Sequence, residues 1–341
     1  MVGSVSVSGW QAVVTGAVAT LMVGTGLAAA ATPARVGSGA VSTRVQGGRG
    51  GQQANGDSWE PAISAGGRFV AFTSSASNLV PGDTNGTEDV FVRDRMAQVT
   101  RRVSVGPGGR QANSDSAEPA ISADGRFVAF ISSASNLVAG DTNATDDVFV
   151  RDRMAQVTRR VSVGTSAQQA NSFSFSLAIS AGGRFVAFTS DASNLVAGDS
   201  NGTEDVFVRD RSVKVTRRVS VGSGGQQGNK ISAFPAISVD GRFVAFFSLA
   251  SNLVAGDTNG HADVFVRDRR VNVTRRTSVG PGGQQADDVS FDPAISADGR
   301  FVAFASPASN LVAGDTNGLA DVFVRDRVAQ VTRRVSVGSG G

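Results

Sequence analysis

Cysteine and tyrosine are absent from this 341-residue chain, histidine occurs once, and lysine occurs only at Lys214 and Lys230. The lack of cysteine excludes disulfides, thiolate metal sites and cysteine nucleophiles. Because almost nothing titrates between neutrality and pH 10, a pI of about 10.3 accompanies a formal net charge of only +3. The high pI therefore indicates missing titratable groups, and it does not predict a nucleic-acid partner.

Charged side chains are also scarce, at 18% of the residues, so disorder driven by charge is not expected. No segment shows helical periodicity. The composition is instead 40% hydrophobic with 42 glycines, which is typical of an all-β protein with many turns.

The N-terminal part of the chain has no charged side chain before Arg35. The apolar stretch at 12–31 ends in a run of alanines that offers cleavage sites, and Pro33 follows. We expect a signal peptide over residues 1–31, a linker over 32–41 and the folded domain over 42–338. An uncleaved membrane anchor is the alternative. Both place the domain outside the cytoplasm of a bacterial cell, and cleavage would leave no stable membrane span.

Two sequence strings recur five times at a constant step of 58 residues. The arginine of GRFVAF falls at Arg68, Arg126, Arg184, Arg242 and Arg300, and DVFVRDR begins at Asp89, Asp147, Asp205, Asp263 and Asp321. A fixed period of this size indicates one supersecondary unit copied in tandem.

Each unit contains four segments with β character. In the first copy these are 61–64, 68–73, 89–93 and 98–105, and the short connections make neighbouring strands antiparallel. In the second strand Ala71 and Phe72 face opposite ways, and both are apolar. A sheet with two apolar faces must be covered on both sides. The sequence therefore predicts a five-bladed β-propeller of four-stranded antiparallel blades; an open solenoid would usually have shorter repeats.

Two features concern the edges of the predicted blades. Each fourth strand carries an arginine pair, as at Arg101 and Arg102, which suits an outermost edge strand. The segment 43–45 aligns with 101–103 and is a partial further copy of the fourth strand. Either this segment or the C-terminal strand at 332–337 would close the ring, and the sequence leaves both open.

The string ISADGRFVAF followed by DVFVRDR resembles the WD40-like repeat of TolB-type periplasmic propellers. The resemblance extends from Pro61 to about Arg327. It implies a propeller fold, an extracytoplasmic location and a general protein-binding role. TolB-type propellers have six blades and a shorter repeat, so the resemblance does not transmit their particular partner.

The loop between the second and third strands is a candidate calcium site. Oxygen-bearing side chains stand at its first, third and seventh positions, although the bidentate glutamate of a typical calcium loop is missing. A turn capped by its own aspartates is the alternative. The candidate ligands are Asp83, Asn85, Asp89, Asp141, Asn143, Asp147, Asp199, Asn201, Asp205, Asp257, Asn259, Asp263, Asp315, Asn317 and Asp321.

The five copies differ most just before the first strand, in a segment that we expect to be a loop at the mouth of the channel, where function is usually located. Acidic residues predominate there in copies one, two and five, which become neighbours if the ring closes, and apolar residues in copies three and four. The candidate ligand-binding residues are Asp57, Trp59, Glu60, Asp115, Glu118, Phe173, Phe175, Phe234, Asp288, Phe291 and Asp292.

These features predict a monomeric, non-enzymatic propeller that binds a protein, a peptide or another ligand such as a carbohydrate at the channel mouth. Calcium would order its loops, and no catalytic residue is assigned. A glycoside hydrolase or lyase that uses carboxylates of the mouth is one alternative, because such chemistry needs two carboxyl groups within about 5–10 Å. A purely structural surface protein is the other.

Overall fold

The computed structural model describes residues 51–338, and these form five sheets of four strands. The predicted signal peptide at 1–31, the linker at 32–41 and the additional strand at 43–45 lie outside the described residues. The described residues include all but the first nine positions of the predicted repeat domain.

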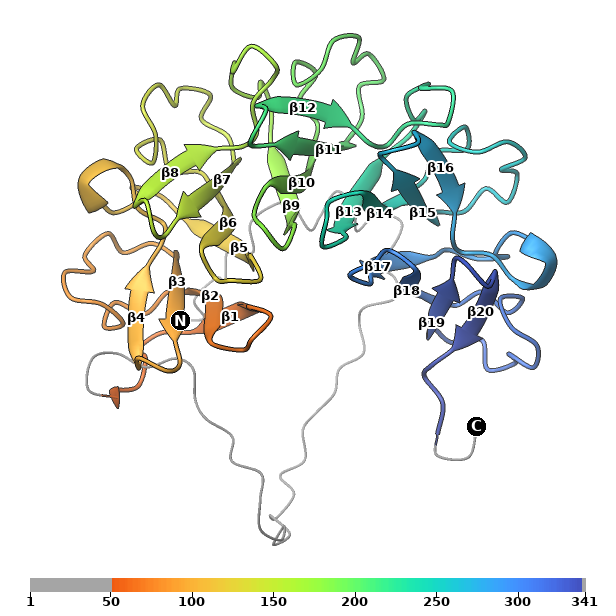
Figure 1. Ribbon diagram of the computed structural model, residues 1–341, viewed down its shortest axis with the longest axis horizontal. Coiled ribbons are helices and arrows are strands. Elements are labelled where there is room, and N and C mark those ends of the chain that lie inside the picture. The colour runs from red at the N-terminus through yellow and green to blue at the C-terminus, as the bar shows by residue number, and fades with distance from the viewer. Residues whose placement is uncertain (1–50, 339–341) are drawn as a thin grey trace, which may run out of the picture. The chain divides into compact units, whose positions relative to one another are not determined.

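The strands follow one another in chain order, and each sheet pairs them antiparallel from first to fourth (Figure 1). The first blade is β1 (Ser58–Ile63), β2 (Phe69–Ser74), β3 (Asp89–Asp94) and β4 (Val99–Arg102). The second is β5 (Ser116–Ile121), β6 (Phe127–Ser132), β7 (Asp147–Asp152) and β8 (Val157–Arg160). The third is β9 (Ser174–Ile179), β10 (Phe185–Ser190), β11 (Asp205–Asp210) and β12 (Val215–Arg218). The fourth is β13 (Ser232–Ile237), β14 (Phe243–Ser248), β15 (Asp263–Asp268) and β16 (Val273–Arg276). The fifth is β17 (Phe291–Ile295), β18 (Phe301–Ser306), β19 (Asp321–Asp326) and β20 (Val331–Arg334), and η3 (Pro107–Gly109) and η4 (Pro281–Gly283) are single 3-10 turns.

Apolar side chains on both faces of each sheet form the core, as the alternation predicts. The face of the first blade that carries Ala71, Val90 and Val92 packs against the second blade. The second blade meets it with Val128, Phe130 and Phe149. The same pairing of small with aromatic side chains joins the second blade to the third, the third to the fourth and the fourth to the fifth. The predicted five-bladed propeller is confirmed.

The second and third strands lie where the sequence places them, but the first and fourth do not. β1 begins at Ser58, three residues before the expected start, because Ser58 and Trp59 already pair with β2. β4 ends at Arg102, three residues before the expected end. Val103 N still donates to Val90 O, but the chain then turns through a bridge between Val105 and Gln111.

The last blade differs from the first four because one face of its sheet is not covered by a following blade within the described residues. Val322 and Val335 are 43% and 50% exposed, whereas the equivalent Val90 and Val103 are 0% and 2% exposed because the next blade covers them. Among the described residues, substantial contacts between strands join only consecutive blades. The expected contact between the fifth and first blades is therefore not seen within residues 51–338.

The two ends of the blades are built differently. We call the end with the β1–β2 and β3–β4 turns of each blade the turn end, and the opposite end the loop end. At the turn end, Ala65 N donates to Ala123 O of the next blade at 3.1 Å, and this link recurs along the series. Gly125 has φ 74°, and a Cβ there would lie 2.1 Å from the ring of Phe69, so the turn requires glycine. Within the described part of the chain, no helix is long and apolar enough to cross a membrane.

Candidate functional site

A β-bulge interrupts the first strand of every blade. In the first blade the register shifts between Trp59 and Ala62. The residue in the bulge has a left-handed backbone in all five blades: Glu60 (φ 52°), Glu118 (50°), Ser176 (47°), Phe234 (55°) and Asp292 (51°). Such a conformation costs a non-glycine residue on the order of 1–3 kcal/mol. The variable segment therefore lies largely inside the first strand, and the prediction of a loop ahead of that strand is wrong.

The bulge places two carboxylates so that they bond to the following blade. The Glu60 carboxylate accepts a hydrogen bond from Thr73 Oγ1 at 2.8 Å and another from the backbone N–H of Glu118 at 2.8 Å. The Glu118 carboxylate in turn accepts from the backbone N–H of Ser176 at 3.1 Å. Corresponding residues of blades one, two and three are thus linked in series at the loop end.

Three more carboxylates adjoin this pair. Asp115 Oδ1 accepts a hydrogen bond from the backbone N–H of Glu88 at 3.0 Å. Glu88 interacts electrostatically with Asp115 and Glu60, and Asp146 with Asp115 and Glu118. We call these five residues the acidic cluster. Within the described residues, none of the five forms an ion pair with a basic side chain, so the cluster carries uncompensated negative charge.

The pKa values of the cluster respond to this crowding. Surrounding protein and the Glu60 carboxylate raise the pKa of Glu118 to about 7, although the residue stays accessible to solvent. Burial raises the pKa of Glu88, with Asp115 and Glu60 adding to the effect. Burial and Asp115 likewise raise the pKa of Asp146. A strongly raised pKa at an accessible group is a feature that binding and catalytic sites often have.

An apolar group occupies the corresponding place in blades four and five. Phe234, in the bulge, lies edge to face with Phe247 at 6.1 Å between ring centroids. Ile231, Phe234 and Phe291 pack around the buried Ala233 and Phe247. The structure thus brings together Phe234 and Phe291, two of the predicted aromatic residues, but they pack against other side chains and are only half-buried.

The remaining predicted residues of this segment are not members of the acidic cluster. Trp59 and Phe175 are half-buried in β1 and β9, opposite Thr73 and Thr189. Phe173 is half-buried just before β9. Asp57 is exposed, and only its carbonyl bonds to the β2–β3 loop, accepting from Ser75 N at 3.1 Å.

The acidic residues of the fifth blade are also separate from the cluster. Asp288 lies beside His261, with 3.8 Å between Nδ1 and Oδ1. Burial raises the pKa of Asp292, and no other charged group contributes to that shift. The expected continuous acidic arc from the fifth blade through the first is therefore not seen among the described residues.

The candidate calcium loops hold a guanidinium group. Arg102 Nη1 lies 3.1 Å from Asp83 Oδ1 and 2.6 Å from Asp89 Oδ2, and Asn85 donates to Asp89 at 2.9 Å. The Arg102 side chain is 7% exposed, so only the first arginine of each pair faces solvent as an edge charge. The same ion pairs join Arg160, Arg218, Arg276 and Arg334 to the aspartates at 141 and 147, 199 and 205, 257 and 263, and 315 and 321.

These ion pairs give the loop aspartates a counter-charge from within the protein. Across the described residues no group of three or more acidic, histidine or cysteine side chains has a geometry that could hold a metal ion. Asn85 Oδ1 and Thr87 Oγ1 are buried without a hydrogen-bond partner, as are the matching atoms of the next two loops. Calcium binding at Asp83, Asn85, Asp89 and their counterparts stays a prediction, and the arginine accounts for the aspartates without it.

Known proteins resemble this chain in three-dimensional structure. No protein-family model and no curated protein matches the chain. An oligogalacturonate lyase solved in complex with manganese superposes with a TM-score of 0.50 at 11% identity, over 81% of this chain and 64% of the lyase. The chain has the fold of a β-propeller. At such low identity the likeness extends to the fold alone.

Two TolB structures are also similar. TolB from Acinetobacter baumannii has a TM-score of 0.46 at 14% identity over 83% of this chain, and this chain spans 55% of its length. A putative TolB from Agrobacterium tumefaciens has a TM-score of 0.48 at 16% identity, over 83% of this chain and 81% of that protein. The five four-stranded sheets themselves fit the propeller fold that the repeat resemblance implies.

Sequence reasoning missed Glu88 and Asp146, which complete the acidic cluster. Both immediately precede the third strand, a position occupied by Glu204 in the third blade and by Ala262 and Ala320 in the last two. Glu204 is 8% exposed, and its Oε2 has no hydrogen-bond partner. The change from an acidic residue to alanine at this position of the repeat was the sequence signal that could have identified Glu88 and Asp146.

Proposed function

We propose that this protein is a binding module whose acidic cluster, at the loop end of blades one to three, receives a positively charged segment of a protein or peptide. The supporting observation is that five adjoining carboxylates have no basic partner among the described residues, while Glu118 has a pKa near 7. A ligand with Lys or Arg side chains would supply the missing counter-charge. The apolar group around Phe234 adds a neighbouring surface for hydrophobic side chains of the same segment.

The module is proposed to act outside the cytoplasm, where the predicted signal peptide at 1–31 would deliver it. Repeated blades give a rigid support on which a few varied positions set the specificity. The strained bulges fit this role, because residues held in a rare backbone conformation present their side chains in a fixed direction.

Binding is tested with a fluorescent ten-residue peptide of alternating lysine and leucine, followed by fluorescence anisotropy at pH 8. Glu118→Gln removes one charge from the cluster and keeps an acceptor for Ser176 N, so it should weaken binding at least fivefold without lowering the melting temperature. Asp292→Asn alters the same bulge position in the fifth blade, away from the cluster, and should leave the affinity within twofold. Equal affinities for wild type and Glu118→Gln would refute the proposal.

A glycoside hydrolase or lyase is the second candidate, and the raised pKa of Glu118 favours it. A carboxylic acid with a pKa near 7 beside an accessible carboxylate is suited to general acid–base chemistry on a sugar. One protein of similar fold is an oligogalacturonate lyase. Release of reducing ends from plant or microbial polysaccharides by wild type, abolished in Glu118→Gln and in Glu60→Gln, would establish the enzyme; polysaccharide binding without turnover would exclude it.

A further inference from the structure

The turn end holds a second charged feature, of opposite sign to the acidic cluster. Phe69, at the start of β2, has the guanidinium of its own neighbour Arg68 at 4.8 Å from the ring centroid and that of Arg153, from the next blade, at 4.5 Å. The same arrangement is found in three further places: Phe127 with Arg126 and Arg211, Phe185 with Arg184 and Arg269, and Phe243 with Arg242 and Arg327. Each junction between consecutive blades is therefore occupied by arginine.

The two arginines at a junction differ in how their charge is balanced. Arg68 forms an ion pair with Asp94 at 2.7 Å. Arg153 donates to the carbonyl of Gly125 and forms no ion pair within the described residues. Burial lowers the pKa of Arg153; Arg101 and Arg68 add to the effect, and Asp94 and Asp124 oppose it. Burial brings the pKa of the equivalent Arg269 to about 10. The junction thus contains a guanidinium that forms no ion pair of its own, because Asp94 is already paired with Arg68.

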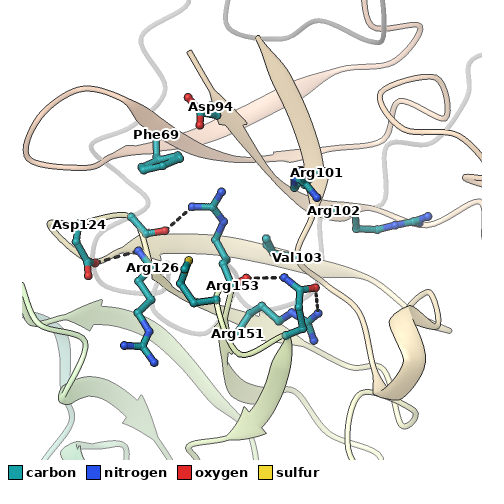
Figure 2. A pocket seen from close by; sticks show the side chains of 12 residues that line it. Phe69, Asp94, Arg101, Arg102, Val103, Asp124, Arg126, Arg151 and Arg153 are labelled. Atoms are coloured by element: carbon teal, nitrogen blue, oxygen red, sulfur yellow. Dashed lines mark hydrogen bonds between the residues drawn. The ribbon is translucent and has the colours of Figure 1, made fainter. Parts of the chain in front are cut away.

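A second arginine without an ion pair faces the same space. Arg101, on β4 of the preceding blade, is exposed, and within the described residues it pairs with no carboxylate. Figure 2 shows Arg153 extending towards Phe69, with Arg101 on the neighbouring strand and Arg102 directed away. The pair of Arg101 and Arg153 recurs as Arg159 and Arg211, Arg217 and Arg269, and Arg275 and Arg327.

The space between these arginines is open to a ligand. The groove between the first two blades has a volume of about 590 Å³, and the groove between the last two about 400 Å³. Asp124 lines the first groove, but its carboxylate already accepts from Ser122 Oγ and from the backbone N–H of Arg126. Between blades two and three Gly182 takes the place of this aspartate, so that junction is more positive still.

We propose that these junctions form a series of anion sites that bind an acidic polysaccharide, with one carboxylate or sulfate group at each pair of arginines. A guanidinium offers a planar set of donors that matches such oxyanions. Four equivalent sites on one rigid support favour a polymer with regularly spaced charges over a single small anion, since each further contact adds avidity. Nucleic acid is disfavoured because two guanidinium groups already lie over the phenylalanine ring at each of these four junctions, where they compete with a stacking base.

The experiment is affinity electrophoresis through gels that contain polygalacturonate, dextran sulfate or neutral dextran, at several salt concentrations. Wild type should be retarded by at least one of the two charged polymers and not by neutral dextran. The variant that carries Arg101→Gln, Arg159→Gln, Arg217→Gln and Arg275→Gln should bind that polymer at least tenfold more weakly and with a shallower salt dependence, because fewer counter-ions are released. All four side chains are exposed, so its melting temperature should match wild type.

Single substitutions provide the matched control. Arg333 occupies the same position in β20, but no following blade supplies an arginine opposite it among the described residues. Arg217→Gln should therefore weaken polymer binding two- to threefold, and Arg333→Gln should not change it. Unchanged binding by the fourfold variant would overturn the proposal. Tighter binding to single-stranded DNA than to either charged polymer would overturn the choice of polysaccharide.

Discussion

At the scale of single residues, the pKa of Glu118 shows how local surroundings determine the properties of a side chain. It lies in a β-bulge, accepts a hydrogen bond from the next blade, and has Glu60 and Asp146 as charged neighbours. The contacts with Glu60 and Ser176 depend on the packing of consecutive blades, which brings together residues 58 positions apart. The raised pKa of Glu118 is thus a property of the assembled blades, and it has a measurable consequence for stability.

The folded protein holds a proton on Glu118 up to about pH 7, whereas the unfolded chain releases it near the ordinary value of 4.5. The folded state therefore binds more protons between these limits, and stability falls as the pH rises through this window. Glu118→Gln removes that loss. We expect the variant to melt at the same temperature as wild type at pH 5 and at a higher temperature at pH 8, by differential scanning calorimetry. The same difference at both pH values would contradict the raised pKa.

At the scale of elements, the sequence is a good guide wherever local pattern decides. The alternation in 68–73 and 89–93 predicts β2 and β3 to within one residue, since their apolar faces are complete in the sequence. The alternation does not predict the bounds of β1, because no local sequence pattern marks a bulge that holds a glutamate in a left-handed conformation. The sequence also fails to predict the ion pair of Arg102 with Asp83. The two residues are 19 positions apart and meet only after the loop folds back over β4.

The arginine inside the loop should be a major stabilising element of each blade. Arg218 is 9% exposed and lies 3.0 Å from Asp199 and 2.7 Å from Asp205. Arg218→Gln would leave two buried carboxylates without a counter-charge, so we expect a loss of about 3–5 kcal/mol in the free energy of unfolding, measured by urea denaturation.

The fifth blade supplies the control for this prediction. Arg334 makes the equivalent ion pairs at 3.1 Å, but its side chain is 24% exposed, so Arg334→Gln should cost distinctly less. Equal losses for the two variants would mean that burial does not determine the strength of these ion pairs. A rise in the melting temperature of wild type on addition of calcium would show that a metal ion shares the role assigned to the arginine.

At the scale of the whole repeat domain, the charges are separated between the two ends of the blades. The acidic cluster lies at the loop end of blades one to three, and the arginine junctions lie at the turn end between each pair of blades. The repeat period and the apolar faces could be predicted from the sequence, and Glu60, Asp115 and Glu118 are among the residues that it singles out as candidates. The grouping of these residues with Glu88 and Asp146, and their separation from Asp288 and Asp292, depend on which blades are in contact.

The most direct test of the proposed site is hydrogen–deuterium exchange of the protein with and without the lysine–leucine peptide. We predict slower exchange in segments 84–88, 112–118 and 142–146 and in the first strand of the third blade, with no change at 288–292 or in the arginine turns. Protection confined to the turn end, or spread equally over all five blades, would contradict a cationic site on the acidic cluster.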